Sequence, residues 1–405
     1  MKTRYDVSPW VHRFPDSRRP AYPRLRGDHA TSLVVIGGGL TGCAVAYACT
    51  VAGLRPFVLE AGRLATGSSG RSAGLLLPEP GPSFRTVVGA HGLRAARRMF
   101  EAWRRASLDA AALIRRLGIK AGLESHDSVT LALGGDDRQL RREFDARHDA
   151  VLDAHWLNTR QVRQLTRLDT SAAIRLEGAF SVDPYRVALG LAQAASKRGA
   201  TFFERTRVTN VRWTRKHAQL ALDGATIRAD RVIVATGTAT PEYKPLRRHF
   251  TRNHRYLVLT EPITLAVRKQ IAGDDVTVRD STSPHHRIRW APDHRLLVAG
   301  ADQEELPARL REKTFVQRTG QLMYELLTMY PMIAGLMPEY GWDVTYGETA
   351  DGLMYIGPHR NYPHHLFALG GDADSITGAF LAARILARAA ADASSRDDDV
   401  FGWMR

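Results

Sequence analysis

The feature that most constrains this chain is a run of glycines between a short apolar segment and a helical one. Residues 31–36 read Thr-Ser-Leu-Val-Val-Ile, a β-branched run typical of a buried parallel strand. Gly37-Gly38-Gly39-Leu40-Thr41-Gly42 follows and matches the G-x-G-x-x-G pattern. A helix is expected through Cys43 to Ala52, and residues 55–60 read as the next strand. The sequence therefore predicts the start of a βαβ unit.

Each glycine of this pattern has a physical task in binding a dinucleotide. Gly37 permits the tight turn, Gly39 lets a pyrophosphate approach the backbone, and Gly42 allows the helix to pack closely on the strand. The helix N-terminus then faces the phosphates with free N–H groups and a positive dipole end. Glu60 ends the second strand, where its carboxylate can accept hydrogen bonds from unphosphorylated ribose hydroxyls. This pattern alone leaves FAD and NAD both open.

The segment after Glu60 favours FAD. Residues 63–74 are rich in glycine and hydroxyl side chains, a composition suited to wrapping a phosphate and passing close to a flat ring. A nicotinamide-dependent dehydrogenase would share the glycine pattern but would have no reason for this loop.

The rest of the chain predicts two interleaved domains. Strand-like runs lie near both ends, and alternating stretches between about 255 and 300 indicate an antiparallel sheet. The fold class expected is α/β plus α+β, a Rossmann-like FAD-binding domain interleaved with an antiparallel-sheet substrate domain. The expected divisions are a surface leader at 1–30, a FAD-binding domain at 31–90, 171–245 and 340–405, and a substrate domain at 91–170 and 246–339.

Composition excludes several classes of protein. No apolar run approaches the roughly 18 residues of a membrane span, and the first residues lack a secretory signal, so we expect a cytoplasmic protein. The only cysteines, Cys43 and Cys49, lie on nearly opposite sides of one expected helix, which leaves neither a disulfide nor a metal site. The net charge of +15 comes from 57 basic residues, of which only 7 are lysine, spread along the chain. We favour a compositional background over a nucleic-acid surface, because binding requires a clustered patch.

With these motifs in place, the chain resembles the FAD-dependent oxidoreductases of the D-amino-acid oxidase, glycine oxidase and sarcosine oxidase superfamily. The resemblance runs from about residue 8 to the end and is carried by the glycine motif with Glu60 and by residues 65–74, 229–237 and 349–378. Residues 8–10 and 289–300 look most like the γ-glutamylputrescine oxidase branch.

The resemblance implies a set of residues around noncovalently bound FAD. It places the loop after Glu60 beside the flavin and pyrophosphate, Val208 near the adenine, and residues 370–377 at the pyrimidine edge of the ring, where helix N–H groups stabilise the reduced flavin. No metal is expected. The cofactor-binding residues predicted are Gly37, Gly39, Leu40, Thr41, Gly42, Glu60, Ala61, Ser68, Ser69, Arg71, Ser72, Val208, Thr236, Gly237, Gly371, Ser375, Ile376 and Thr377.

Two residues are candidates for contact with substrate. Relatives carry glycines where residues 372–375 stand, so Asp374 is either recruited to hold a cationic amine or is one of a pair of exposed aspartates that cap the helix. Arg289 lies on a strand that roofs the flavin in relatives, where a guanidinium could bind a carboxylate bidentately, and a surface role is the alternative.

The function expected is oxidation of a C–N bond of an amine or amino acid, by hydride transfer to flavin N5 and hydrolysis of the imine. The partners are the small-molecule substrate and oxygen or another electron acceptor. Two alternatives stay open: a flavin-dependent RNA-modifying enzyme acting on an aminoalkylated base, and a noncatalytic flavin-binding subunit.

Overall fold

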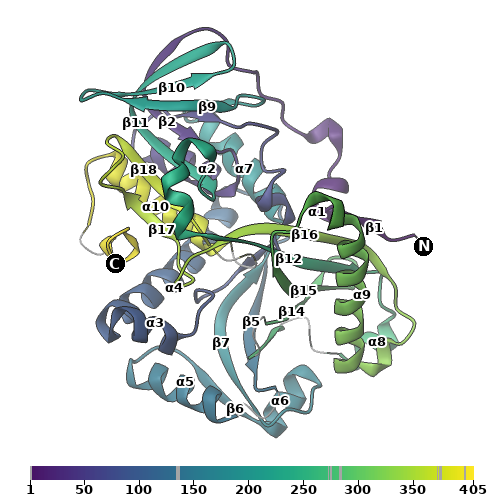
Figure 1. Ribbon diagram of the computed structural model, residues 1–405. Coiled ribbons are helices and arrows are strands. Elements are labelled where there is room, and N and C mark those ends of the chain that lie inside the picture. The colour runs from purple at the N-terminus through teal and green to yellow at the C-terminus, as the bar shows by residue number, and fades with distance from the viewer. Residues whose placement is uncertain are drawn as a thin grey trace.

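The computed structural model describes residues 2–133, 137–271, 273, 276–281, 285–371, 373, 376–395 and 398–405. Two sheets dominate the chain (Figure 1), and helices cover their outer faces. The α-helices are α1 (Pro9–His12), α2 (Leu40–Val51), α3 (Phe84–His91), α4 (Leu93–Arg116), α5 (Asp137–Asp149), α6 (Thr159–Thr166), α7 (Pro184–Ser196), α8 (Leu265–Arg268), α9 (Arg311–Met329) and α10 (Thr377–Ala390). Short 3₁₀ helices are η1 (Asp16–Arg18), η2 (Ser68–Arg71), η3 (Pro241–His249), η4 (Ala308–Leu310), η5 (Pro331–Ile333) and η6 (Asp399–Phe401).

The first sheet contains the βαβ unit predicted from the glycine pattern. Its order is β17-β18-β11-β2-β3-β8, and the pairs from β18 to β8 are parallel. In the same sheet, β10 pairs antiparallel with the first residues of β11, and β9 pairs antiparallel with β10. The strands are β2 (His29–Ile36), β3 (Phe57–Leu59), β8 (Thr201–Phe203), β9 (Val208–Trp213), β10 (Ala218–Leu222), β11 (Ala225–Gly237), β17 (Tyr355–Pro358) and β18 (His365–Leu369).

The second sheet is mostly antiparallel, as the alternating stretches predicted. Its order is β1-β16-β12-β15-β14-β13-β5-β7-β4, and β6 also pairs with β7. The helix α9 lies alongside β12, β15 and β16 (Figure 1). The strands are β1 (Arg4–Tyr5), β4 (Leu75–Leu76), β5 (Glu124–Leu131), β6 (His155–Asn158), β7 (Ala172–Ser181), β12 (Thr251–Thr260), β13 (Val276–Asp280), β14 (Arg287–Ala291), β15 (Arg295–Glu304) and β16 (Pro338–Glu348).

The predicted fold class is confirmed, whereas the domain boundaries stay predictions. The second sheet takes β7, which lies inside the 171–245 segment expected in the FAD-binding domain. The leader expected on the surface at 1–30 contributes β1 to this sheet and buries Trp10, which is 7% exposed.

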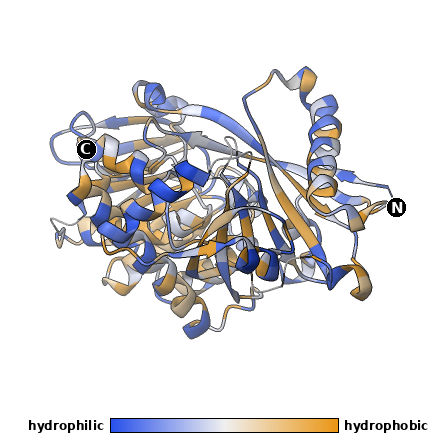
Figure 2. Cartoon of the chain, turned by 90° about the horizontal axis from the view of Figure 1, so that it is seen from below, coloured by the Kyte–Doolittle hydropathy of each residue, from blue (hydrophilic) through white to orange (hydrophobic). Residues whose placement is uncertain are grey.

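Local chemistry explains where the helices begin. Asp183 accepts a hydrogen bond from the Arg186 N–H, and Pro184 occupies the first turn of α7, as its sequence indicated. By contrast α2 begins after Gly39, which has no side chain to cap the first turn. In Figure 2 the outer helices carry both hydrophilic and hydrophobic residues, as expected for helices that bury one face.

One hydrophobic core is continuous across both sheets. It contains Val45 of α2, Leu257 of β12 and Trp342 of β16, which are each at most 1% exposed. This shared core fixes the first sheet against the second, so side chains from both can line one cavity. No helix among the described residues is long and apolar enough to cross a membrane.

Candidate active site

The glycine turn after β2 has the close contacts that the motif requires. Gly37 has a φ of +106°, and a Cβ there would lie 2.6 Å from the Ala235 carbonyl oxygen. A Cβ on Gly42 would lie 1.8 Å from the Gly37 carbonyl oxygen, so the first turn of α2 packs directly on the strand end. Both positions therefore require glycine for the fold itself.

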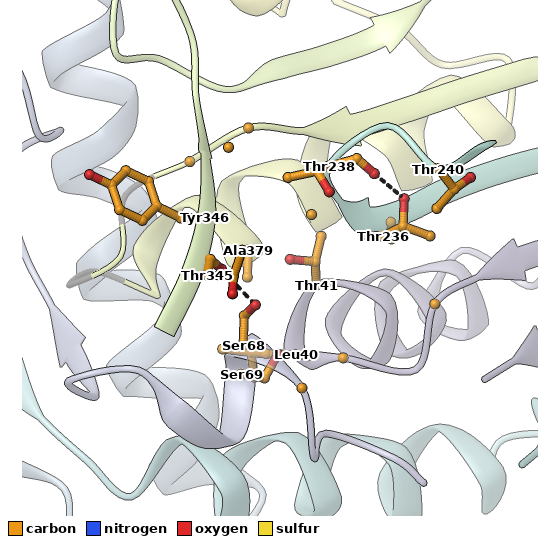
Figure 3. Close-up of a pocket in the computed structure, with 18 of the residues that line it drawn as sticks. Leu40, Thr41, Ser68, Ser69, Thr236, Thr238, Thr240, Thr345, Tyr346 and Ala379 are labelled. Carbon is orange, nitrogen blue, oxygen red and sulfur yellow. Dashed lines mark hydrogen bonds between the residues drawn. The ribbon is translucent and has the colours of Figure 1, made fainter. Parts of the chain in front are cut away.

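The N-terminus of α2 meets the loop that follows Glu60. The Leu40 N–H donates to the Ser69 hydroxyl over 2.7 Å, and a Cβ on Gly39 would lie 2.9 Å from that same hydroxyl oxygen. In Figure 3, Thr41 lies between Ser69 on one side and Thr236 on the other. These backbone and hydroxyl donors suit the oxygens of a pyrophosphate at a helix N-terminus.

Glu60 lies immediately after β3, where the sequence placed the ribose-binding acid. Its carboxylate accepts hydrogen bonds from the Gly38 N–H at 2.8 Å and from the Gly62 N–H at 2.7 Å. A carboxylate has about four acceptor sites, so two remain for ribose hydroxyls. Val208 lines the same cavity.

These elements surround one cavity of about 600 Å³. Gly42 lies just outside it against Gly37, and the Thr377 hydroxyl is buried and donates to the Leu77 carbonyl. Asp374 and Ser375 lie outside the described residues. The predicted residues that line the cavity are Gly37, Gly39, Leu40, Thr41, Glu60, Ala61, Ser68, Ser69, Arg71, Ser72, Val208, Thr236, Gly237, Gly371 and Ile376.

Arg289 is placed differently from what its candidate role requires. The side chain is buried, and it donates from Nε and Nη2 to the Ala73 carbonyl and from Nη1 to the Trp290 carbonyl. Burial lowers the pKa of its guanidinium to about 10. It is not among the residues that line the cavity, and its role as a substrate ligand stays a prediction.

Sequence reasoning missed residues of the second sheet at the cavity. Tyr346 of β16 lines it, and its hydroxyl donates to Asp302 over 2.8 Å. Asp302 in turn accepts two hydrogen bonds from buried Arg255, at 2.7 and 2.6 Å. Burial raises the pKa of Tyr346, and the Asp302 charge raises it further, so the phenol stays protonated. Figure 3 shows Tyr346 on the opposite side of the view from Thr240.

A group of charges borders the cavity where the leader meets β16. Arg71 Nη2 lies 2.6 Å from both Asp343 and Asp6, and His254 donates to Asp343 over 2.5 Å. Arg311 adds a second guanidinium 3.3 Å from Asp343. Burial alone would raise the pKa of Asp343, but the hydrogen bond from His254 and the charges of Arg71 and Arg311 outweigh it and lower the pKa to about 2.

Two buried donors show that the cavity suits a ligand with hydrogen-bond acceptors. Trp103 of α4 and Tyr243 of η3 both line it, and each is at most 2% exposed. Within the described part of the chain, neither the Trp103 indole N–H nor the Tyr243 hydroxyl has a partner. A buried donor left unpaired costs about 1–3 kcal/mol, so a bound molecule with acceptor atoms would remove that cost. The residues present therefore fit a dinucleotide.

Fold and site together define a class of flavoenzyme. The sequence profile described as "FAD dependent oxidoreductase" matches residues 32–389. The chain belongs to this family, its cofactor is FAD, and it is an enzyme, which confirms the resemblance drawn from the sequence.

Particular relatives agree with this assignment. The chain is 26% identical to glycine oxidase of Bacillus licheniformis, over 83% of this chain and 86% of that protein. It is 23% identical to gamma-glutamylputrescine oxidoreductase of Escherichia coli (strain K12), over 87% of this chain and 82% of that protein. The crystal structure of glycine oxidase from Geobacillus kaustophilus superposes with a TM-score of 0.76 at 20% identity, and the match covers 93% of this chain and 99% of that one.

Proposed function

We propose that this protein oxidises a C–N bond of an amine or an amino acid. The observation that carries the proposal is similarity over more than four fifths of the chain to two relatives whose names state a nitrogen-bearing substrate, glycine and gamma-glutamylputrescine. The cavity supports it, because the glycine turn, Glu60 and Tyr346 line one continuous space of about 600 Å³.

The roles of the chain's residues follow from their positions. The Leu40 N–H and the Ser69 hydroxyl would hold the pyrophosphate, and Glu60 would hold the adenosine ribose. Bound FAD supplies a two-electron oxidation in which the carbon bearing nitrogen gives up a hydride and the resulting imine is hydrolysed by water. Trp103 and Met354 line the cavity with Tyr346 and restrict access of water to that chemistry.

Tyr346 is a polar side chain of the cavity wall that a bound substrate could contact. The Tyr346 hydroxyl is held by Asp302, which Arg255 neutralises, so this phenol presents a fixed dipole rather than a charge. Asp374 stays a predicted ligand for an amine. The predicted role of Arg289 as a carboxylate ligand is not part of this proposal, because its guanidinium donates to the Ala73 and Trp290 carbonyls and does not line the cavity. FAD is proposed to be noncovalent, and a cytoplasmic location stays a prediction.

The test is flavin reduction under anaerobic conditions with matched substrates. Alanine and lactate share a carbon skeleton, but alanine carries an amino group where lactate carries a hydroxyl group. The pair therefore distinguishes C–N from C–O oxidation. We expect the flavin absorbance near 450 nm to bleach with amines or amino acids and to persist with their hydroxyl counterparts. Bleaching by hydroxy acids alone would contradict the proposal.

The same preparation tests the cofactor linkage and the electron acceptor. Heating or acid should release a yellow supernatant, and colour retained on precipitated protein would contradict noncovalent binding. Admitting oxygen to the reduced enzyme then distinguishes an oxidase, which reoxidises rapidly, from a dehydrogenase, which requires another acceptor.

A further inference from the structure

The loop that borders the FAD cavity is held by its backbone oxygens. The carbonyls of residues 71, 72 and 73 each accept a hydrogen bond from a different side chain. Trp342 Nε1 donates to residue 71 over 2.7 Å, and Trp10 Nε1 donates to residue 72 over 3.0 Å. Arg289 donates to residue 73 from Nε at 2.9 Å and from Nη2 at 2.6 Å. Three consecutive peptide groups are thereby fixed in orientation.

None of these three donors comes from the first sheet. Trp342 lies on β16, Arg289 on β14, and Trp10 on α1 of the leader. All three are buried, and the Arg289 guanidinium lies 5.4 Å from the centre of the Trp10 ring, in cation–π geometry. The leader and the second sheet therefore hold the loop jointly, and loss of one donor weakens the support of another.

Burying a guanidinium here is costly, which indicates that its contacts matter. Arg289 is 4% exposed, and its hydrogen bonds go to the main-chain oxygens of Ala73 and Trp290. A lysine could not reproduce this arrangement, because its ammonium lacks the planar fork that bonds one oxygen through two nitrogens. An apolar residue would leave the Ala73 carbonyl buried without its donors.

Because a peptide group is planar, holding its carbonyl also fixes the direction of its N–H. In a trans peptide the carbonyl of one residue and the N–H of the next point in opposite directions. The N–H groups of residues 72, 73 and 74 therefore face away from Trp342, Trp10 and Arg289. The Gly74 N–H is taken by the Ser72 hydroxyl at 3.2 Å. Arg71 and Ser72 line the FAD cavity and Ala73 does not, so of the remaining N–H groups that of Ser72 lies at the cavity wall.

We propose that Trp10, Arg289 and Trp342 are positioning residues that hold residues 71–73 as a wall of the FAD cavity, with the Ser72 N–H directed toward the bound cofactor. The leader is then part of the cofactor site. The inference depends on FAD as cofactor and not on which substrate is oxidised, so it stands or falls independently of the C–N assignment.

Conservative variants of the full-length chain test the inference. Trp10→Phe keeps the ring and removes its N–H, and Arg289→Lys keeps the charge and removes the fork. We expect each to raise the FAD dissociation constant of the apoprotein about tenfold, which is the loss of about one hydrogen bond. Each should also shift the flavin absorption maximum and reduction potential. The control is Trp213→Phe on β9, where the ring is 38% exposed, and it should change none of these.

Two results would overturn the inference. In the first, the variants lower the melting temperature of the apoprotein, but the FAD dissociation constant stays within twofold and the flavin spectrum and reduction potential do not change. The three residues would then have a purely structural role. In the second, Arg289→Lys leaves the flavin properties unchanged and slows reduction only by substrates that carry a carboxylate. Arg289 would then read the substrate.

Discussion

Gly39→Ala separates cofactor binding from folding at the glycine turn. Gly39 has a φ of −73° and a ψ of −175°, a backbone conformation that alanine adopts without strain. The new Cβ would lie 2.9 Å from the Ser69 hydroxyl oxygen, an atom at the end of a side chain that can rotate away. The apoprotein should therefore fold, with a free energy of unfolding within about 1 kcal/mol of the parent.

The same methyl group occupies space that the pyrophosphate needs. It would keep a phosphate oxygen from the Leu40 N–H, which now donates to Ser69. A hydrogen bond to a charged group contributes about 1.5–3 kcal/mol, so losing one should raise the FAD dissociation constant between roughly tenfold and 150-fold. Titration of the apoprotein with FAD, followed by flavin fluorescence, measures this change.

Two companion variants make the result interpretable. Gly42→Ala places a Cβ 1.8 Å from the Gly37 carbonyl oxygen, which is backbone and cannot rotate away, so this variant should destabilise the fold itself. Adding Ser69→Ala to Gly39→Ala removes the close hydroxyl contact and should restore apoprotein stability without restoring affinity for FAD. If Gly39→Ala binds FAD within twofold of the parent, the pyrophosphate does not approach this turn and the reasoning is wrong.

Three further predictions concern the polar groups of the site. Glu60→Gln removes one acceptor for the Gly38 or Gly62 N–H and should weaken FAD binding about tenfold. Glu242→Gln, in the same cavity, is the control, and unchanged affinity of the Glu60 variant would contradict its role in holding the ribose. Tyr346→Phe removes the hydrogen bond to Asp302 and should lower the free energy of unfolding by about 1 kcal/mol, measured in urea; no loss would show that this bond contributes nothing. Asp343 has a pKa of about 2 in the folded protein against an ordinary 3.8, so it stabilises the fold above about pH 4 and this stability disappears as the pH falls toward 2. The shift is worth about 2 kcal/mol, so the parent should lose that much more than Asp343→Asn between pH 5 and pH 2, and parallel pH profiles would refute it.

The glycine turn could be predicted from sequence because its requirements are local. A glycine at positive φ, an apolar run before it and an acid after the next strand are set by neighbouring residues, and β2, α2 and β3 follow in that order. Pro184 marked the start of α7 for the same reason. Cys43 and Cys49 are both buried and free, as their spacing on one helix required.

The part of the cavity lined by Tyr346 and Trp103 could not be predicted, because it depends on contacts between distant parts of the chain. Tyr346 of β16 reaches Asp302 of β15 only because both strands pair with β12, each in one register, and a slip by one residue would turn Tyr346 to the opposite face. Trp103 reaches the same cavity from a helix more than 200 residues earlier in the chain. Local sequence patterns do not show such long-range contacts, so the sequence offered Arg289 and Asp374 as substrate ligands and did not predict Tyr346 or the carbonyl partners of Arg289.

The pairing of the leader with β16 has a consequence for biosynthesis. Arg4 lies opposite Tyr340, and the Thr3 hydroxyl donates to the Pro338 carbonyl, 335 residues further along. At about 5–20 residues per second, a ribosome needs on the order of 20 to 70 seconds to reach that partner. For most of this interval Trp10 lacks Arg289, and for all of it the leader lacks β16, so the Trp10 indole is without the contacts that bury it in the folded protein. We therefore expect docking of the leader to be a late step in maturation, after the residues of the early βαβ unit have been synthesised.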